Sequence, residues 1–192
     1  MNKRIFWQKI IDENPDGKLI FIHTPKCGGS YVSKILKDLN ISKKGHHQAI
    51  KNEGINFTVI RDPIDRFQSL LNYRLGHPAP RKDWPTHLEY VYNDKSVTLN
   101  NLITKMTDAE ILGFRPYSTL TFWTTNVDII ITIDQLPELL DCFGYQYDEK
   151  SYPPMNMSVK ERGSFNNKTR NRLANLFKDD ILLYNKVKHS AL

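Results

Sequence analysis

The chain has 192 residues, of which 40% are hydrophobic and 25% charged, and its formal net charge at pH 7 is +6. This length and composition are ordinary for one globular domain with a substantial core, and they exclude a disordered or low-complexity chain. No apolar run approaches the roughly 20 residues of a membrane span. The two cysteines are too few for a disulfide framework, so we expect both to be reduced.

A short helix is predicted at the N-terminus, because Ile5, Phe6, Ile10 and Ile11 fall on one side of a helix ahead of Pro15. Charged residues interrupt this segment, and its apolar run is too short for a signal peptide. We therefore expect the helix to be part of the folded domain.

The segment LIFIHTPKCGGSY, residues 19–31, combines an apolar strand, a glycine loop and the start of a helix. This arrangement suits an anion, because the glycines allow a close approach and the helix N-terminus favours negative charge. Lys26 adds a cation. The lysine precedes the glycines, so the segment is not a Walker A loop, in which the lysine follows the second glycine. The alternative interpretation is a plain β–α turn with a solvated lysine.

The segment NFTVIRDPIDRFQSLLNY contains a second short, β-branched strand, followed at once by Arg61 and then by a helix that carries Ser69. An arginine at a strand end and a serine on the next helix can bind one phosphate together. The alternative is that Arg61 pairs with Asp62 or Asp65 and that Ser69 is merely a small residue.

Further elements follow from the apolar periodicity. Helices are expected over residues 88–92, 99–106, 136–143 and 167–187, and a buried strand over 127–133. Strands that alternate with helices predict an α/β fold with a central parallel sheet and helices on both faces. Its ligand site is expected at the carboxyl ends of the strands, where both of the segments described above end.

Taken together, HTPKCGGSY and VIRDPIDRFQS resemble the PAPS-dependent sulfotransferase superfamily, in particular its carbohydrate-type and related bacterial or viral branch. That family has a HxPKTGGT-like loop, which holds the 5′-phosphosulfate, and an RDPxxRFxS-like segment, which holds the 3′-phosphate. Cys27 and Ser30 stand where the family usually has threonine. The resemblance covers most of the chain, is weakest over residues 74–110, and implies a single sulfotransferase domain, residues 1–192, with a P-loop-NTPase-like sheet.

The resemblance also implies which residues bind the cofactor, 3′-phosphoadenosine 5′-phosphosulfate (PAPS), and its product adenosine 3′,5′-bisphosphate (PAP). Arg61 and Ser69 would hold the 3′-phosphate. The loop residues that would hold the 5′-phosphosulfate are Thr24, Pro25, Lys26, Cys27, Gly28, Gly29, Ser30 and Tyr31. A later basic-glycine element would close over the 3′-phosphate, or would be an exposed turn: Lys160, Arg162 and Gly163.

The segment KKGHHQAI supplies the candidate catalytic base. Alignment of Ala49 with the family's alanine makes His46 the base, and a slip of one residue makes it His47. A histidine can accept a proton at neutral pH, although a surface pair without a role is the alternative. Lys26 would stabilise the transferring group, and no metal is required.

The resemblance leaves the acceptor open. A carbohydrate hydroxyl is the family-level expectation, and a lipid, a small metabolite or a peptide tyrosine are alternatives. Candidate acceptor contacts are Arg74, Arg81, Lys82 and Trp84, unless this region is a solvated loop. Many animal relatives carry an N-terminal membrane anchor, for which the apolar runs of this sequence are too short. We therefore expect a soluble, cytoplasmic protein of bacterial, phage or viral origin, or a trimmed form of a longer chain.

Three other functions remain as alternatives. A P-loop nucleotide kinase or other phosphotransferase would share the strand–loop–helix, and a non-catalytic binding protein would keep only the nucleotide fold. Nucleic-acid binding is disfavoured because the basic residues are scattered rather than clustered. Cys27 as a nucleophile is a further possibility, since a lysine and a helix N-terminus lower the pKa of a thiol.

Overall fold

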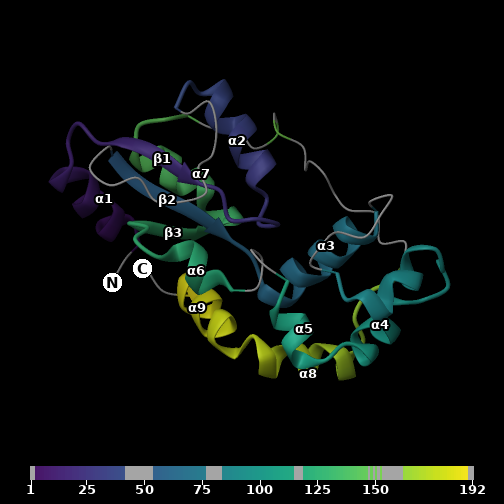
Figure 1. Cartoon of the computed structure of the whole chain (residues 1–192). Helices are drawn as coiled ribbons and strands as arrows, with labels where there is room; N and C mark the ends of the chain where they lie inside the picture. The colour runs from purple at the N-terminus through teal and green to yellow at the C-terminus, as the bar shows by residue number, and fades with distance from the viewer. Residues whose placement is uncertain are drawn as a thin grey trace. The chain divides into compact units, whose positions relative to one another are not determined.

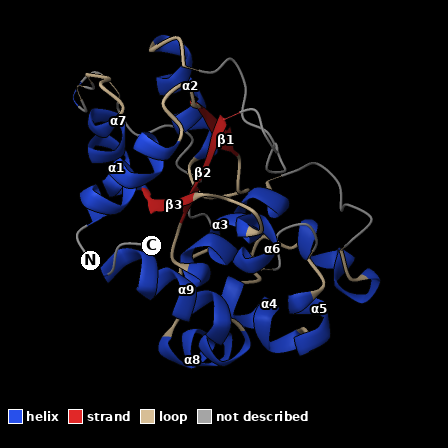
Figure 2. Ribbon diagram, turned by 90° about the vertical axis from the view of Figure 1, so that its left-hand side faces the viewer, coloured by secondary structure: helices blue, strands red, loops and turns tan. Residues whose placement is uncertain are grey.

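The computed structural model describes residues 3–41, 54–76, 84–114, 119–146, 148, 150, 152 and 162–189. Within this part of the chain three strands alternate with helices, and the helices make up most of the structure (Figure 1, Figure 2). None of the helices found in these ranges has the length and hydropathy needed to cross a lipid bilayer. The chain divides into two compact units, which we call the first and the second unit. The first contains Met1–Arg61, Leu120–Asn156 and Leu182–Leu192, and the second contains Asp62–Thr119 and Met157–Ile181.

The first unit contains a three-stranded parallel sheet in the order β1-β2-β3 (Figure 1). The strands are β1 (Lys18–Ile22), β2 (Gly54–Ile60) and β3 (Ile129–Thr132). Phe57 in β2 pairs with Phe21 of β1 and with Ile129 of β3. The sequence predicts all three strands. It extends β1 to His23 and β3 to Ile133, whereas these strands end at Ile22 and Thr132. The predicted α/β fold class is thereby confirmed.

The helices follow the apolar periodicity of the sequence. They are α1 (Lys3–Glu13), α2 (Gly29–Asp38), α3 (Pro63–Leu75), α4 (Leu99–Lys105), α5 (Asp108–Leu112), α6 (Leu120–Thr124), α7 (Leu136–Cys142), α8 (Asn167–Leu176) and α9 (Lys178–His189), with 3₁₀ helices η1 (Thr86–Tyr92) and η2 (Ile133–Gln135).

Alternate residues of the sheet face two different hydrophobic clusters, as the period of two in a strand requires. Phe57 and Ile131 belong to a large cluster that also contains apolar residues of α1, α2 and α7. Ile60 and Ile130 belong to a smaller cluster on the other face, together with Leu120 of α6 and with residues of α9. Helices therefore contribute to the core on both faces of this sheet.

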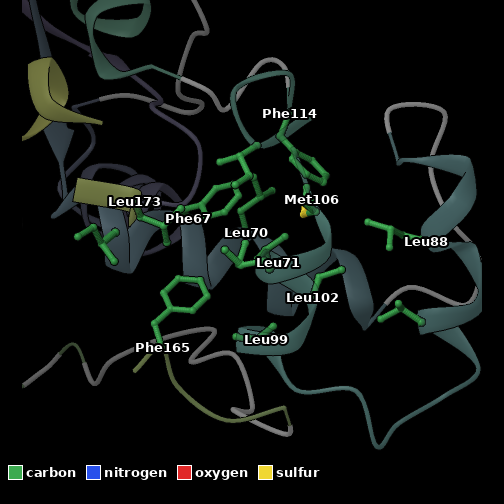
Figure 3. Packing of buried hydrophobic residues seen from close by; sticks show 14 of the residues in the cluster. Phe67, Leu70, Leu71, Leu88, Leu99, Leu102, Met106, Phe114, Phe165 and Leu173 are labelled. Atoms are coloured by element: carbon green, nitrogen blue, oxygen red, sulfur yellow. The ribbon is translucent and has the colours of Figure 1, made fainter. Parts of the chain in front are cut away.

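The second unit is helical and has its own core, in which Phe67, Leu70 and Leu71 of α3 meet apolar residues of α4 and α8 (Figure 3). The ring of Phe67 contacts that of Phe114, with centroids 6.0 Å apart. The helix α3 begins where the sequence predicts, because the Asp62 side chain accepts hydrogen bonds from the first-turn N–H groups.

The C-terminal helix differs from its prediction. The apolar pattern predicts one helix over residues 167–187, whereas α8 and α9 are separated at Phe177, which has φ −102° and ψ 23°. Leu173 and Phe177 pack in the core of the second unit, while Val187 belongs to the smaller cluster of the first unit. A count of apolar residues along one stripe cannot reveal that they serve two different cores.

Candidate functional site

The glycine loop, residues 24–28, joins the carboxyl end of β1 to the N-terminus of α2 in the first unit (Figure 1). Two of its residues have left-handed backbones, Lys26 with φ 64° and Gly28 with φ 85°. Alternation of left-handed with other residues turns successive N–H groups toward one side, where they can surround an anion. The two left-handed residues are compatible with such an arrangement, and the anion site itself stays a prediction.

Hydrogen bonds fix the base of this loop to the sheet. The hydroxyl of Thr58 donates to the carbonyl of Ile22 at 2.7 Å, so the Thr24 hydroxyl donates to Thr58 Oγ1, also at 2.7 Å. The Cys27 N–H donates to the carbonyl of Thr24 at 3.4 Å. The side chain of Thr24 thus holds the loop in place.

The Cys27 side chain is only 3% exposed and packs with Ile60, Leu120 and Val187. Reactive cysteines are partly exposed and lie in electropositive surroundings, so this apolar position gives no support to the nucleophilic alternative. The side chain of Cys27 instead fills the core beneath the loop.

Two cations converge at the carboxyl ends of the strands. Burial, and in second place the charge of Arg61, lower the pKa of the Lys26 ammonium below its ordinary value of 10.5. Arg61 follows the last residue of β2 and is exposed. Because β1 and β2 are parallel neighbours, their ends bring Lys26 and Arg61 to the same edge of the sheet.

Two residues beside the loop lie outside every sequence-based prediction of the site. The ring of His23 lies against Gly29, where an added Cβ would be 1.9 Å from His23 Cδ2. Ile133 follows β3 and is 41% exposed, and its Cδ1 would lie 3.8 Å from a Cβ at Gly28. The position of His23 inside the motif HTPKCGGSY was a signal for the first, whereas nothing in the apolar run ending at Ile133 distinguished the second.

Three of the predicted 3′-phosphate residues, Ser69, Arg162 and Gly163, lie in the second unit. Ser69 is a half-buried residue of α3. Arg162 is 8% exposed, and its Nη1 donates to the carbonyl of Asp94 at 2.9 Å. Gly163, which follows it, has φ 81°. The Arg162 side chain therefore makes a hydrogen bond within the second unit. Its role at the 3′-phosphate stays a prediction, as does that of Ser69.

Among the acceptor candidates, Arg74 and Trp84 are buried in the second unit, and Trp84 Nε1 donates to the carbonyl of Leu88 at 3.0 Å. Both side chains thus belong to the interior of that unit rather than to an acceptor surface. The other acceptor candidates, Arg81 and Lys82, lie outside the described residues. The same is true of the candidate bases His46 and His47 and of Lys160, which is predicted at the 3′-phosphate. Within the described ranges, no group of three or more His, Cys, Asp or Glu side chains is arranged to hold a metal ion.

Comparison of the chain with protein-family models, with curated proteins and with solved structures found no match. The assignment of function therefore depends on the two sequence motifs and on the geometry of the loop.

Proposed function

We propose that this chain is a sulfotransferase with a P-loop-like fold. It moves a sulfuryl group from PAPS to an acceptor hydroxyl, which belongs to a carbohydrate. The observation that carries the proposal is the pair of cations, Lys26 in the glycine loop and Arg61 after β2, at one edge of the sheet. Two like charges at a helix N-terminus repel each other, and a ligand with several anionic groups removes that repulsion. PAPS is such a ligand.

The residues of the loop fit the phosphosulfate end of PAPS. The first N–H groups of α2 have no acceptor within the helix, so Gly29 and Ser30 can donate to anionic oxygens. The Lys26 ammonium adds a positive charge that stabilises the oxygens on which charge develops during transfer. A guanidinium binds a phosphate with two parallel hydrogen bonds, which is the role proposed for Arg61 at the 3′-phosphate, with Ser69 as a second donor.

Bound PAPS supplies the sulfuryl group, and PAP is released when the acceptor oxygen has formed its bond to sulfur. His46 or His47 takes the proton of the acceptor hydroxyl in that step. The other residues position the two reactants and stabilise charge, as in phosphoryl transfer.

Calorimetric titration with PAP and with ATP, both without metal, tests the proposal. We expect PAP to bind and ATP, which lacks a 3′-phosphate, to bind much more weakly. Binding of ATP alone would favour a nucleotide kinase or another phosphotransferase. Binding of neither would leave a protein that keeps only the nucleotide fold.

The role of Arg61 is tested by Arg61→Ala, which should weaken PAP binding by about tenfold to a hundredfold, the range for a lost charge-assisted hydrogen bond. The matched control is Arg4→Ala, which removes an exposed arginine of the first unit that pairs with Asp141. An affinity for PAP that is the same in both variants would contradict the assignment of Arg61 to the 3′-phosphate.

A further inference from the structure

The imidazole of His23 occupies the space that a side chain at Gly29 would need. A Cβ built on Gly29 would lie 1.9 Å from Cδ2 and 2.1 Å from Nε2 of His23. Atoms cannot approach so closely, so this edge of the ring requires glycine at the first residue of α2. The ring also stacks on Phe21, with centroids 6.0 Å apart and planes inclined by 24°.

The position of this space places the imidazole close to the N-terminus of α2. In a helix the Cα–Cβ bond leans toward the N-terminus. The space beside the Cα of Gly29 therefore lies on the N-terminal side of the first turn of α2. An anion held by the first N–H groups of the helix would lie on the same side. Nε2 is one of the two ring atoms closest to that space.

His23 is half-buried rather than buried, and it follows β1 at the same edge of the sheet as Lys26 and Arg61. A protonated ring nitrogen of an imidazole at this edge can donate a hydrogen bond to an anionic oxygen.

We propose that His23 is a ligand of the anion bound at the start of α2, and that it donates a hydrogen bond from its ring to an oxygen of the 5′-phosphate or phosphosulfate. This inference rests on the proposed function, because it takes PAPS or PAP as the anion. It is separate from the roles of His46 and His47, which would handle the acceptor proton.

The test compares three substitutions by calorimetric titration with PAP. His23→Gln and His23→Met have side chains of nearly equal length and both lose the ring, but only glutamine keeps a donor. His23→Phe keeps a ring over Gly29 and against Phe21 and loses both nitrogens. We expect glutamine to bind PAP about tenfold more tightly than methionine or phenylalanine, the effect of one hydrogen bond to a charged group.

Thermal unfolding of each variant without ligand separates folding from binding. The comparison of glutamine with methionine stays valid if loss of the ring destabilises both proteins equally. Equal PAP affinity of the wild type, His23→Met and His23→Phe would overturn the role of His23 and leave the proposed function standing. Failure of the wild type to bind PAP would instead overturn the proposed function.

Discussion

Lys26 combines several energetic costs at a single residue. Its backbone is left-handed, with φ 64°, which costs a residue other than glycine about 1–2 kcal/mol. Its ammonium is partly buried and is close to the charge of Arg61, and both effects lower its pKa. Strain and repulsion of this kind persist where function requires them, and they make the ligand-free protein less stable than it could be.

Substitution Lys26→Met removes the charge but not the backbone strain. It should raise the free energy of unfolding of the ligand-free protein at pH 7 by at most about 1 kcal/mol, because solvent screens a partly exposed charge. Because the folded-state pKa of Lys26 is lowered, the unfolded chain binds more protons than the folded chain between that pKa and 10.5. The stability of the wild type should accordingly rise relative to Lys26→Met as the pH rises through this window. Urea denaturation at neutral and at alkaline pH measures both effects.

The matched control for this experiment is Lys34→Met, which removes an exposed lysine of α2. Lys34→Met should leave stability nearly unchanged at either pH. A constant stability difference between the wild type and Lys26→Met across the alkaline window would contradict the cost assigned to the Lys26 charge.

Arg162 illustrates a residue for which a binding role and a structural role make opposite predictions. Its Nη1 donates to the carbonyl of Asp94, and its own carbonyl accepts from the N–H of Leu99 at 3.1 Å. The same Nη1 also donates to the buried carbonyl of Val97 at 3.4 Å. Arg162→Ala leaves that carbonyl without this donor, so we expect a loss of about 1–3 kcal/mol in the free energy of unfolding without ligand. Unchanged thermal stability combined with weaker PAP binding would show instead that Arg162 acts chiefly at the phosphate.

At the scale of elements, the sequence predicts β1, the glycine loop and α2 well, because local signals agree there. An apolar run, two glycines and a helical period follow one another without conflict, and the structure confirms this order. The same agreement predicts β2, α3 and the position of Arg61 between them. The strand boundaries are misplaced. His23 and Ile133 continue the predicted strands after sheet pairing has stopped, β3 begins at Ile129 rather than Val127, and β2 begins at Gly54 rather than Phe57.

Contacts between elements are what the sequence could not predict. The ring of His23 over Gly29 and the methyl group of Ile133 near Gly28 each join residues of different elements. Periodicity describes one segment at a time and carries no information on such pairs. The break at Phe177 has the same origin, since it depends on which core each half of the segment joins.

The contact of His23 with Gly29 gives a prediction for this element pair. Gly29→Ala places a methyl group where the imidazole lies, so it should destabilise the protein by about 1–3 kcal/mol, as overpacking does. Adding His23→Ala removes the obstructing ring and should restore part of the loss. A double-mutant cycle measured by chemical denaturation quantifies this coupling.

Gly28→Ala is the control for that cycle. Among the described residues, a Cβ at Gly28 would meet Ile133 Cδ1 alone, at 3.8 Å, but the φ of 85° strains any residue other than glycine. The cost of Gly28→Ala is therefore conformational and should not change when His23→Ala is added. Coupling of equal size at Gly28 and Gly29 would mean that the imidazole is not the specific obstacle.

At the scale of the whole molecule, the described residues form two compact units with separate hydrophobic cores. The sequence predicts a single domain over residues 1–192, and this stays a prediction, since compactness alone does not say whether the units unfold together. The glycine loop with Lys26, and Arg61, belong to the first unit, whereas Ser69 and Arg162 belong to the second. Whether the two units unfold together is therefore a question for experiment.

Hydrogen exchange in two core variants answers whether the units unfold together. Leu71→Ala removes a fully buried side chain of α3 in the second unit, and Leu139→Ala does the same in α7 of the first. Each should cost about 2–5 kcal/mol. If each unit opens as a cooperative unit of its own, Leu71→Ala accelerates exchange in α3, α4 and α8 and leaves β1, β2 and α7 slow, and Leu139→Ala has the reverse effect.

Equal acceleration throughout the chain in both variants would instead show one cooperative domain. In that case a mutation in either core would lower the ratio of folded to unfolded protein for the whole chain by a factor set by its own cost. Separate units would instead let the first keep its loop, Lys26 and Arg61 intact while the second opens.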